Sequence, residues 1–294
     1  GDVYKRQLFH SVVDEDPLPS LGDYSSASIS LSGEYNMGRL WLAMYRGSTK
    51  EHSDPLMRTY LENLIYRLSE TSEVRDRRFE FIILEDKTIN AFAAPGGIIG
   101  INLGMFLNTQ KEGELASVMC HELAHLSQRH FARSQNRNSP LANALMILGS
   151  IAVAAASRNP EAILIAPAAM QQMSINYTRS NEKEADRIGF NNLVKAGFNP
   201  DDMTMMFQRM QDKYQNEDSE QFSYLMTHPL PSERLTDMRI RADSLEKASK
   251  DNYRDNLDFY FMQKRAEVWA EKDIEKLIIK YKKDSKSQIN NISS

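Results

Sequence analysis

A five-residue motif, His-Glu-Leu-Ala-His from His121 to His125, constrains this chain more than any other feature. It lies in a run from 112 to 131 that lacks proline and carries apolar residues at helical spacing. Two histidines four residues apart on a helix project from one face and can form a pair of zinc ligands. Glu122 falls on the same side, where a carboxylate can hold and deprotonate a water molecule on the metal. The pattern predicts a metal site on a half-buried helix; two ordinary histidines on a solvated face are the alternative.

The third ligand of this metal must come from another segment, because catalytic zinc takes three protein ligands and leaves one position for water. Glu182 is the best candidate, since residues 181–189 read as a helix with Glu182 and Asp186 on one face. Asp186 could accept the N–H of a zinc-bound imidazole and fix its ring. Glu184 points elsewhere and is expected to be solvated. A plain charged helix face is the alternative for Glu182 and Asp186.

Two further segments complete a pattern of four motifs. Residues 90–97 read Asn-Ala-Phe-Ala-Ala-Pro-Gly-Gly, and residues 227–234 read Thr-His-Pro-Leu-Pro-Ser-Glu-Arg. In this order the four motifs resemble those of the gluzincin metalloproteases of the HtpX, BepA and CAAX-prenyl-protease group. The resemblance spans residues 90 to 234, and the flanking residues are more similar to the periplasmic BepA-like branch than to the membrane-embedded branches.

The resemblance assigns a role to each motif residue. It implies that one Zn²⁺ per chain is held by His121, His125 and Glu182. Glu122 is then the general base, and Asp186 is the partner that orients a ligand. Zinc lowers the pKa of its water to about 7, and the base passes the proton to the leaving amine. The implied activity is that of a zinc endopeptidase.

His228 and Arg234 belong to the last motif, and each has more than one interpretation. By the resemblance, His228 either stabilises the transition state or acts as a latch that fills the open zinc position at rest. A histidine before proline is otherwise a turn residue. Arg234 could bind an anionic oxygen or pair with Asp186 or another carboxylate.

The span 79–101 changes character, because short apolar or alternating runs replace the helical period. These runs predict a small sheet. A substrate can lie along a sheet edge as an added strand, bound through main-chain hydrogen bonds. The resemblance implies this substrate-binding role for the strand that holds Asn90, Ala91, Phe92 and Ala93. A strand that belongs only to the core is the alternative.

The chain falls into three predicted parts. Residues 1–33 include an Asp-, Pro- and Ser-rich stretch typical of an extended arm. Residues 34–245 hold the motifs, and the resemblance implies a zincin-like α+β, mainly α, domain with a small sheet. Residues 246–294 form a charged helical tail, which by resemblance is the start or a remnant of a tetratricopeptide-like region. Its Lys-, Ser- and Asn-rich end from Lys282 is expected to be frayed.

The segment 141–156 is almost wholly apolar, and 162–170 continues the pattern. Its first run is shorter than the about twenty residues that a membrane-spanning helix needs. A buried helical hairpin, an apolar flap over the cleft or against a membrane surface, and a transmembrane hairpin remain open. The short, interrupted runs favour a soluble protein, or a peripheral one that contacts a membrane through residues 141–170.

The composition of the chain limits the kinds of partner that it can bind and the disulfides that it can form. The formal net charge of −4 offers no basic surface, which argues against nucleic acid. The single Cys120 excludes an intramolecular disulfide and is predicted to be a small buried residue. Residues 1–7 lack the apolar stretch of a secretory signal. A periplasmic protein is made with one, so we expect a mature form, an expressed fragment or an incomplete reading of the gene.

The resemblance to the BepA-like branch implies a periplasmic protease for misfolded or misassembled cell-envelope proteins, chiefly outer-membrane proteins. It also implies a quality-control role and contacts with the envelope assembly machinery. A chaperone-like assembly factor with latent proteolysis, whose cleft mainly holds a client, is the alternative. A purely metal-binding relative is expected to lack Glu122, which this sequence keeps, and this favours the enzyme.

Overall fold

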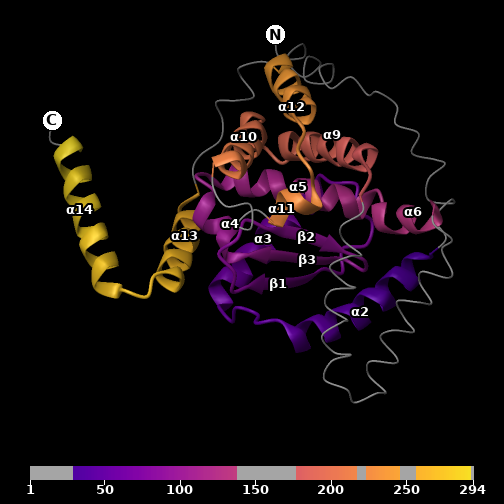
Figure 1. The fold of residues 1–294 in the computed structure, drawn as a ribbon, viewed down its shortest axis with the longest axis horizontal. Coiled ribbons are helices and arrows are strands. Elements are labelled where there is room, and N and C mark those ends of the chain that lie inside the picture. Colours follow the sequence, from indigo (N-terminus) through magenta and orange to yellow (C-terminus); the bar gives the residue numbers. More distant parts are fainter. Residues whose placement is uncertain (1–28, 138–176, 217–222, 246–255, 293–294) are drawn as a thin grey trace, which may run out of the picture.

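The computed structural model of the chain describes residues 29–137, 177–216, 223–245 and 256–292. Helices dominate these residues, and a small sheet lies among them (Figure 1). The elements in chain order are α2 (Leu31–Ser48), α3 (Pro55–Glu70), β1 (Glu80–Leu84), β2 (Ala91–Ala94), β3 (Ile98–Asn102), α4 (Leu103–Asn108), α5 (Glu112–Ser127), α6 (His130–Arg137), α9 (Arg179–Lys195), α10 (Asp201–Asn216), α11 (Ser223–Thr227), α12 (Ser232–Ser244), α13 (Leu257–Ala270) and α14 (Ile274–Ile292). The predicted α+β, mainly α fold is confirmed.

The sheet has three strands in the order β1-β3-β2, with β3 parallel to β1 and antiparallel to β2. Gly96 and Gly97 reverse the chain between β2 and β3 with φ angles of 78° and 79°, which residues with a side chain rarely adopt. Strand β2, which holds most of the segment predicted to bind substrate, is therefore an edge strand of this sheet.

Helix α5 carries the motif and lies between the sheet and α9 (Figure 1). All its residues except Leu126 are buried, because β2, α3, α9 and α10 pack around it. The prediction of a half-buried helix is wrong. Small residues on the faces between the large apolar ones, such as Ala116, Ser117 and Ala124, let neighbouring elements cover the whole helix. Cys120 is buried, as predicted.

Helix α9 approaches α5 closely at Gly189. A Cβ atom on this residue would lie 3.0 Å from the Cα and N atoms of His121, so a side chain does not fit there without a shift. The helix begins after Thr178, whose side chain accepts a hydrogen bond from the Asn181 N–H. The start and the glycine together bring the first turns of α9 against the motif.

The helix predicted to run from 112 to 131 is broken near its end. Helix α5 ends at Ser127, and Arg129 has a φ of 51°, so α6 starts in a new direction at His130. A left-handed conformation costs about 1–2 kcal/mol for a residue with a side chain. A buried ion pair holds Arg129 there, with its Nε atom 2.9 Å from a Glu34 carboxylate oxygen, and its Nη2 atom donates to the Ile29 carbonyl.

Helices lie at or near both predicted domain boundaries, which themselves stay predictions. Helix α2 begins at Leu31 after a Ser30 cap, inside the predicted arm, whose residues 1–28 lie outside the described residues. Helix α13 packs on α3 and α4 and adds buried side chains to the core cluster, so this core continues past residue 245. Helix α14 continues to Ile292, and no glycine or proline interrupts its polar end from Lys282, where fraying stays a prediction.

The apolar segment 141–170 lies outside the described residues, and its three interpretations stay open. Among the helices that the structure describes, none combines the length and the hydrophobicity that crossing a membrane requires. The candidate site is built by residues in or next to β2, α2, α5, α6, α9, α11 and α12.

Candidate metal centre

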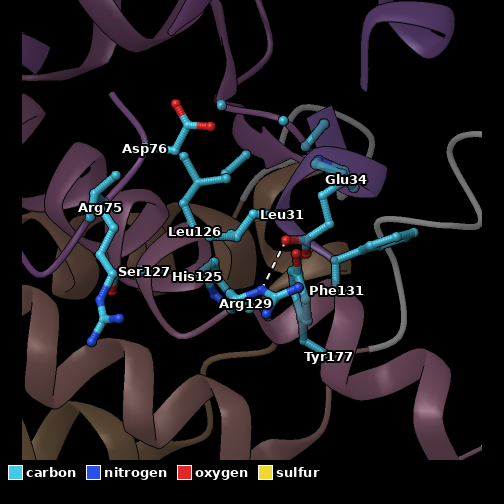
Figure 2. Close-up of a pocket in the computed structure, with 16 residues that line it drawn as sticks. Leu31, Glu34, Arg75, Asp76, His125, Leu126, Ser127, Arg129, Phe131 and Tyr177 are labelled. Carbon is cyan, nitrogen blue, oxygen red and sulfur yellow. Dashed lines mark hydrogen bonds and ion pairs between the residues drawn. The ribbon is translucent and has the colours of Figure 1, made fainter. Parts of the chain in front are cut away.

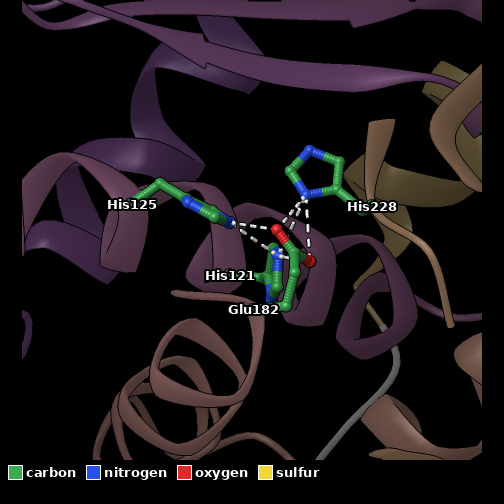
Figure 3. A group of neighbouring side chains, drawn as sticks. All are labelled: His121, His125, Glu182 and His228. Atoms are coloured by element: carbon green, nitrogen blue, oxygen red, sulfur yellow. Dashed lines mark hydrogen bonds and ion pairs between the residues drawn. The ribbon is translucent and has the colours of Figure 1, made fainter. Parts of the chain in front are cut away.

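Three regions of the chain bring four side chains to one point (Figure 3). His121 and His125 project from α5, Glu182 from the first turn of α9, and His228 from the residue after α11. One ligand atom of each residue lies within 4.8 Å of the ligand atoms of the others, and all four side chains are buried. The structure thus gathers the two motif histidines, the predicted third ligand and the predicted latch.

The spacing of the donor atoms of His121, His125 and Glu182 is close to that around a tetrahedral zinc ion. The Nε2 atoms of His121 and His125 are 2.9 Å apart. The Oε2 atom of Glu182 lies 3.4 Å from Nε2 of His121, and its Oε1 atom lies 3.4 Å from Nε2 of His125. Ligands at about 2.0–2.2 Å from zinc are separated by about 3.3 Å along the edge of a tetrahedron. Two imidazoles and a glutamate are also a donor set of catalytic zinc sites, so these residues fit the metal that the motifs predict.

Glu122 is buried beside this cluster, with its Oε1 atom 3.6 Å from Nε2 of His228. Neither of its carboxylate oxygens has a hydrogen-bond partner within the described part of the chain. Burial raises the pKa of this carboxyl, against the opposing effect of His228 and His121. A buried carboxylate that makes no hydrogen bond suits a group that takes a proton from water.

Asp186 lies behind His121, on the side away from the cluster. Its Oδ1 atom is 3.0 Å from Nδ1 of His121, a close ion pair rather than a linear hydrogen bond. Arg234 of α12 holds Asp186 with bonds of 2.6 and 2.7 Å. Its Nη1 atom also lies 2.9 Å from Glu182 and donates to the Pro229 carbonyl. Because all three of its guanidinium nitrogens are engaged, Arg234 links the two acids and the loop that follows His228.

The outer nitrogen of the His125 ring contacts a different group of residues, which the sequence did not predict. Nδ1 of His130 lies 2.9 Å from Nδ1 of His125, and Nε2 of His130 lies 3.0 Å from Glu184. Arg133 donates to the same Glu184 oxygen at 3.0 Å. The prediction that Glu184 is solvated is wrong, because the turn at Arg129 carries His130 and Arg133 to it. His130 follows the motif by five residues, but no helical period connects it with His125.

The two histidines of α5 have opposite protonation tendencies in the metal-free chain. Burial lowers the pKa of His121, but the carboxylates of Asp186 and Glu182 outweigh it and raise the pKa to about 9. Burial holds the pKa of His125 well below its usual value despite Glu182. Burial also acts to raise the pKa of Glu182, yet the surrounding imidazoles bring it well below the usual range.

Two tyrosines that the sequence reasoning missed lie against the imidazoles. Tyr177, just before α9, stacks on His125 with the ring centroids 4.1 Å apart. Tyr224 of α11 stacks on His228 at 4.6 Å, and its carbonyl accepts the His228 N–H at 2.8 Å. The four-residue spacing from Tyr224 to His228 is a helical signal that the sequence offered, whereas nothing local marked Tyr177.

The predicted substrate-binding residues lie at the edge of the sheet. Asn90 immediately precedes β2, and Ala91, Phe92 and Ala93 lie within it. The Phe92 ring packs against aromatic rings of α2. The Phe92 side chain is therefore used in the fold, so only the main chain of this part of β2 would be available to a substrate.

A pocket lies where the end of β2 meets α2 and the C-terminal end of α5 (Figure 2). His125 lines it, so the pocket adjoins the ligand cluster. Ala93 lines it from β2, and Tyr177 lines it from the segment before α9. The ion pair of Arg129 with Glu34 forms part of its wall. The edge strand, the cluster and a recess thus meet at one place.

Comparison with known proteins agrees with this geometry. The model of peptidase family M48 matches residues 55–242. The chain is 41% identical over 239 residues to a putative beta-barrel assembly-enhancing protease of Vibrio cholerae, covering 79% of this chain and 49% of that protein. It is 37% identical over 239 residues to the beta-barrel assembly-enhancing protease of Escherichia coli K12, covering 78% and 48%. The mitochondrial metalloendopeptidase OMA1 of Schizosaccharomyces pombe is 26% identical over 197 residues, or 65% of this chain and 56% of that protein.

The chain spans about half the length of the beta-barrel assembly-enhancing proteases that it matches. The family match covers the chain from α3 to nearly the end of α12, and so includes the four clustered side chains and Glu122. The resemblance predicted from the four motifs is confirmed, and the chain belongs to peptidase family M48.

Proposed function

We propose that this chain is a zinc endopeptidase for misfolded or misassembled proteins of the cell envelope, chiefly outer-membrane proteins. The observation that carries the proposal is a buried carboxylate that makes no hydrogen bond and lies beside donors spaced nearly as around a tetrahedral zinc ion. The donors are His121, His125 and Glu182, which would hold one Zn²⁺. The carboxylate is Glu122. Metal ligands alone would also suit a structural site, whereas a free buried base beside them suits hydrolysis.

Bound zinc supplies a Lewis acid that polarises the scissile carbonyl and makes water more acidic. Glu122 orients the attacking water, takes its proton and delivers that proton to the leaving amine. Burial raises the pKa of Glu122. A raised pKa makes the carboxylate a better acceptor of the proton from water, and the protonated carboxyl can still donate to the leaving amine. Asp186 keeps the ring of His121 oriented from behind.

The substrate would lie along β2 as an added strand. Main-chain groups of Asn90, Ala91, Phe92 and Ala93 would bind it, and such bonds tolerate many sequences. The pocket beside His125 would take a side chain of the substrate. Tolerance of this kind suits an enzyme whose substrates share a misfolded state rather than a sequence.

His228 would act as a latch at rest. Its Nδ1 atom lies 3.0 Å from Glu182 and 3.4 Å from Nε2 of His121, where a fourth ligand would sit. Arg234 tethers the adjoining Pro229 carbonyl and would help to keep the latch closed. This position favours the second candidate function in part, because a latched chain would hold a client without cutting it.

The substrate class and the periplasmic location rest on relatives named beta-barrel assembly-enhancing protease. An enhancer of barrel assembly would meet envelope assembly machinery, so we include that machinery among the partners. A peripheral membrane contact through residues 141–170 remains part of the proposal. The net charge of −4 makes nucleic acid an unsuitable partner.

Glu122→Gln tests the proposal, because glutamine keeps the shape of the side chain and removes the base. Wild type and variant should each bind about one zinc per chain, measured by elemental analysis after dialysis. Only the wild type should cleave unfolded casein, and the variant should lose activity by about 10³-fold or more. Equal cleavage by both proteins, or loss of zinc in the variant, would remove Glu122 from this role. Glu85→Gln, at a surface ion pair, is the matched control.

A further inference from the structure

We propose that His130 and Glu184 are positioning residues that orient the zinc ligand His125 through a directed chain of hydrogen bonds. The inference rests on the proposed zinc site. The chain has two contacts, 2.9 Å from His125 Nδ1 to His130 Nδ1 and 3.0 Å from His130 Nε2 to Glu184. His130 is fully buried, so its contact with His125 is shielded from water, whereas Glu184 is only partly buried.

Donor and acceptor roles along this chain follow from the metal. An imidazole that binds zinc through Nε2 carries its proton on Nδ1, so His125 must donate toward His130. His130 then accepts at Nδ1 and, as a neutral ring, carries its own proton on Nε2. That proton needs an acceptor, and the Glu184 carboxylate lies in the required place. Each step fixes the next one, and the reverse direction would put two N–H groups against each other.

The backbone is built to allow this contact. In a continuous helix, a residue five positions after His125 would be rotated from it by about 140° and would face away. The left-handed residue Arg129 ends α5 and turns His130 back toward the ligand. The ion pair with Glu34 holds Arg129 in this conformation, which a side chain otherwise disfavours. A strained turn at this point is consistent with a positioning task for the residue that follows it.

Glu184 is itself held in place. Arg133 of α6 lies 3.0 Å from the oxygen that faces His130, so α6 supplies both the imidazole and a cation for this carboxylate. Tyr177 stacks on the face of the His125 ring and limits its rotation in another direction. The ring of His125 is therefore restrained at its face and at its outer nitrogen.

Zinc affinity, measured by competition with a chromophoric chelator, tests the inference without relying on activity. His130→Leu removes the acceptor and should weaken zinc binding by about 10- to 100-fold. His130→Asn puts a carbonyl oxygen near the position of Nδ1 and should stay within a few-fold of wild type. Lys183→Ala, on the exposed side of α9, is the control and should leave the affinity unchanged. Unchanged affinity in His130→Leu would overturn the proposal.

A double-mutant cycle tests whether Glu184 acts through His130. Glu184→Ala should weaken zinc binding several-fold in the wild type and have no effect in His130→Leu. Additive effects would overturn the chain of contacts. In the zinc-loaded wild type, nitrogen NMR should find His130 protonated at Nε2, a reading that does not depend on any variant folding. A proton on Nδ1 would overturn the proposal, whereas a wild type that binds no zinc would contradict the proposed function itself.

Discussion

The two histidines of α5 have supports of different kinds. Behind His121 lies Asp186, a carboxylate clamped by the buried Arg234. Behind His125 lies the neutral ring of His130, which leads to Glu184 nearer the surface. Both supports use α9, but the first is completed by α12 and the second by α6. His121 is thus held by a buried charged group. His125 is held by a chain of two hydrogen bonds, through His130 to Glu184, which we call the relay and which ends near the surface.

The two supports should contribute differently to the stability of the fold and to metal binding. A fully buried ion pair is costly to disturb, because either partner left alone is an unpaired charge away from water. A half-buried pair such as Glu184 with Arg133 loses little when one partner is removed, since water replaces it. We therefore expect the support of His121 to govern stability as well as metal binding, and the support of His125 to adjust metal binding alone.

The largest expected effect is on zinc content, and it should distinguish the ligand Glu182 from the supporting residue Glu184 on the same helix, α9. Glu182→Ala removes a donor atom, and the protein should lose nearly all its zinc on dialysis. Glu184→Ala should keep about one zinc per chain at saturating metal, because it changes only the relay behind His125. Elemental analysis of both variants checks this. Equal zinc contents would mean that Glu182 is not the third ligand.

The next effect concerns stability. Arg234→Ala leaves Asp186 and Glu182 buried without their cation and should cost about 3–5 kcal/mol in the free energy of unfolding. Arg133→Ala should cost less than about 1 kcal/mol. Urea unfolding of the two zinc-free variants beside the wild type measures the difference. Similar losses for both arginines would refute the contrast between the two supports.

The two supports should also set the protonation of the rings. In the zinc-free protein, His121 should keep its second proton as the pH rises until it passes about 9, because its folded pKa is raised. His125 should lose its second proton at a much lower pH than His121, since burial holds its pKa well below the usual value. Histidine nitrogen NMR across pH 5 to 10 reads both. Matching titration curves would mean that the two environments are equivalent.

The smallest effect concerns the latch. If His228 fills the open position about nine-tenths of the time, His228→Ala should raise the rate of casein cleavage by about tenfold. A role in the transition state predicts a fall of about 10²-fold instead. His52→Ala, at the partly buried pair of His52 with Glu85 and outside the ligand cluster, is the control. An unchanged rate with normal zinc content would leave His228 a structural residue.

Much of this site follows from local patterns, and the rest depends on tertiary turns. Helical spacing identified His121 with His125, and Glu182 with Asp186, since each pair lies within one turn of one helix. The sequence did not predict the contact of His130, because this contact requires a left-handed backbone at Arg129. A glycine at that position would have indicated such a backbone, but an arginine does not. The complete burial of α5 depends on α9 and α10, which no local pattern reports. The parallel pairing of β1 with β3 likewise joins segments that only the fold brings together.

Anomalous diffraction at the zinc edge, from crystals of the chain grown with zinc, tests the central claim most directly. We predict one peak per chain, at about 2.0–2.2 Å from Nε2 of His121, Nε2 of His125 and a Glu182 oxygen. That result would support both the ligand set and the catalytic proposal built on it. A peak held by other residues, or a cluster that stays free of zinc at saturating metal, would contradict the account.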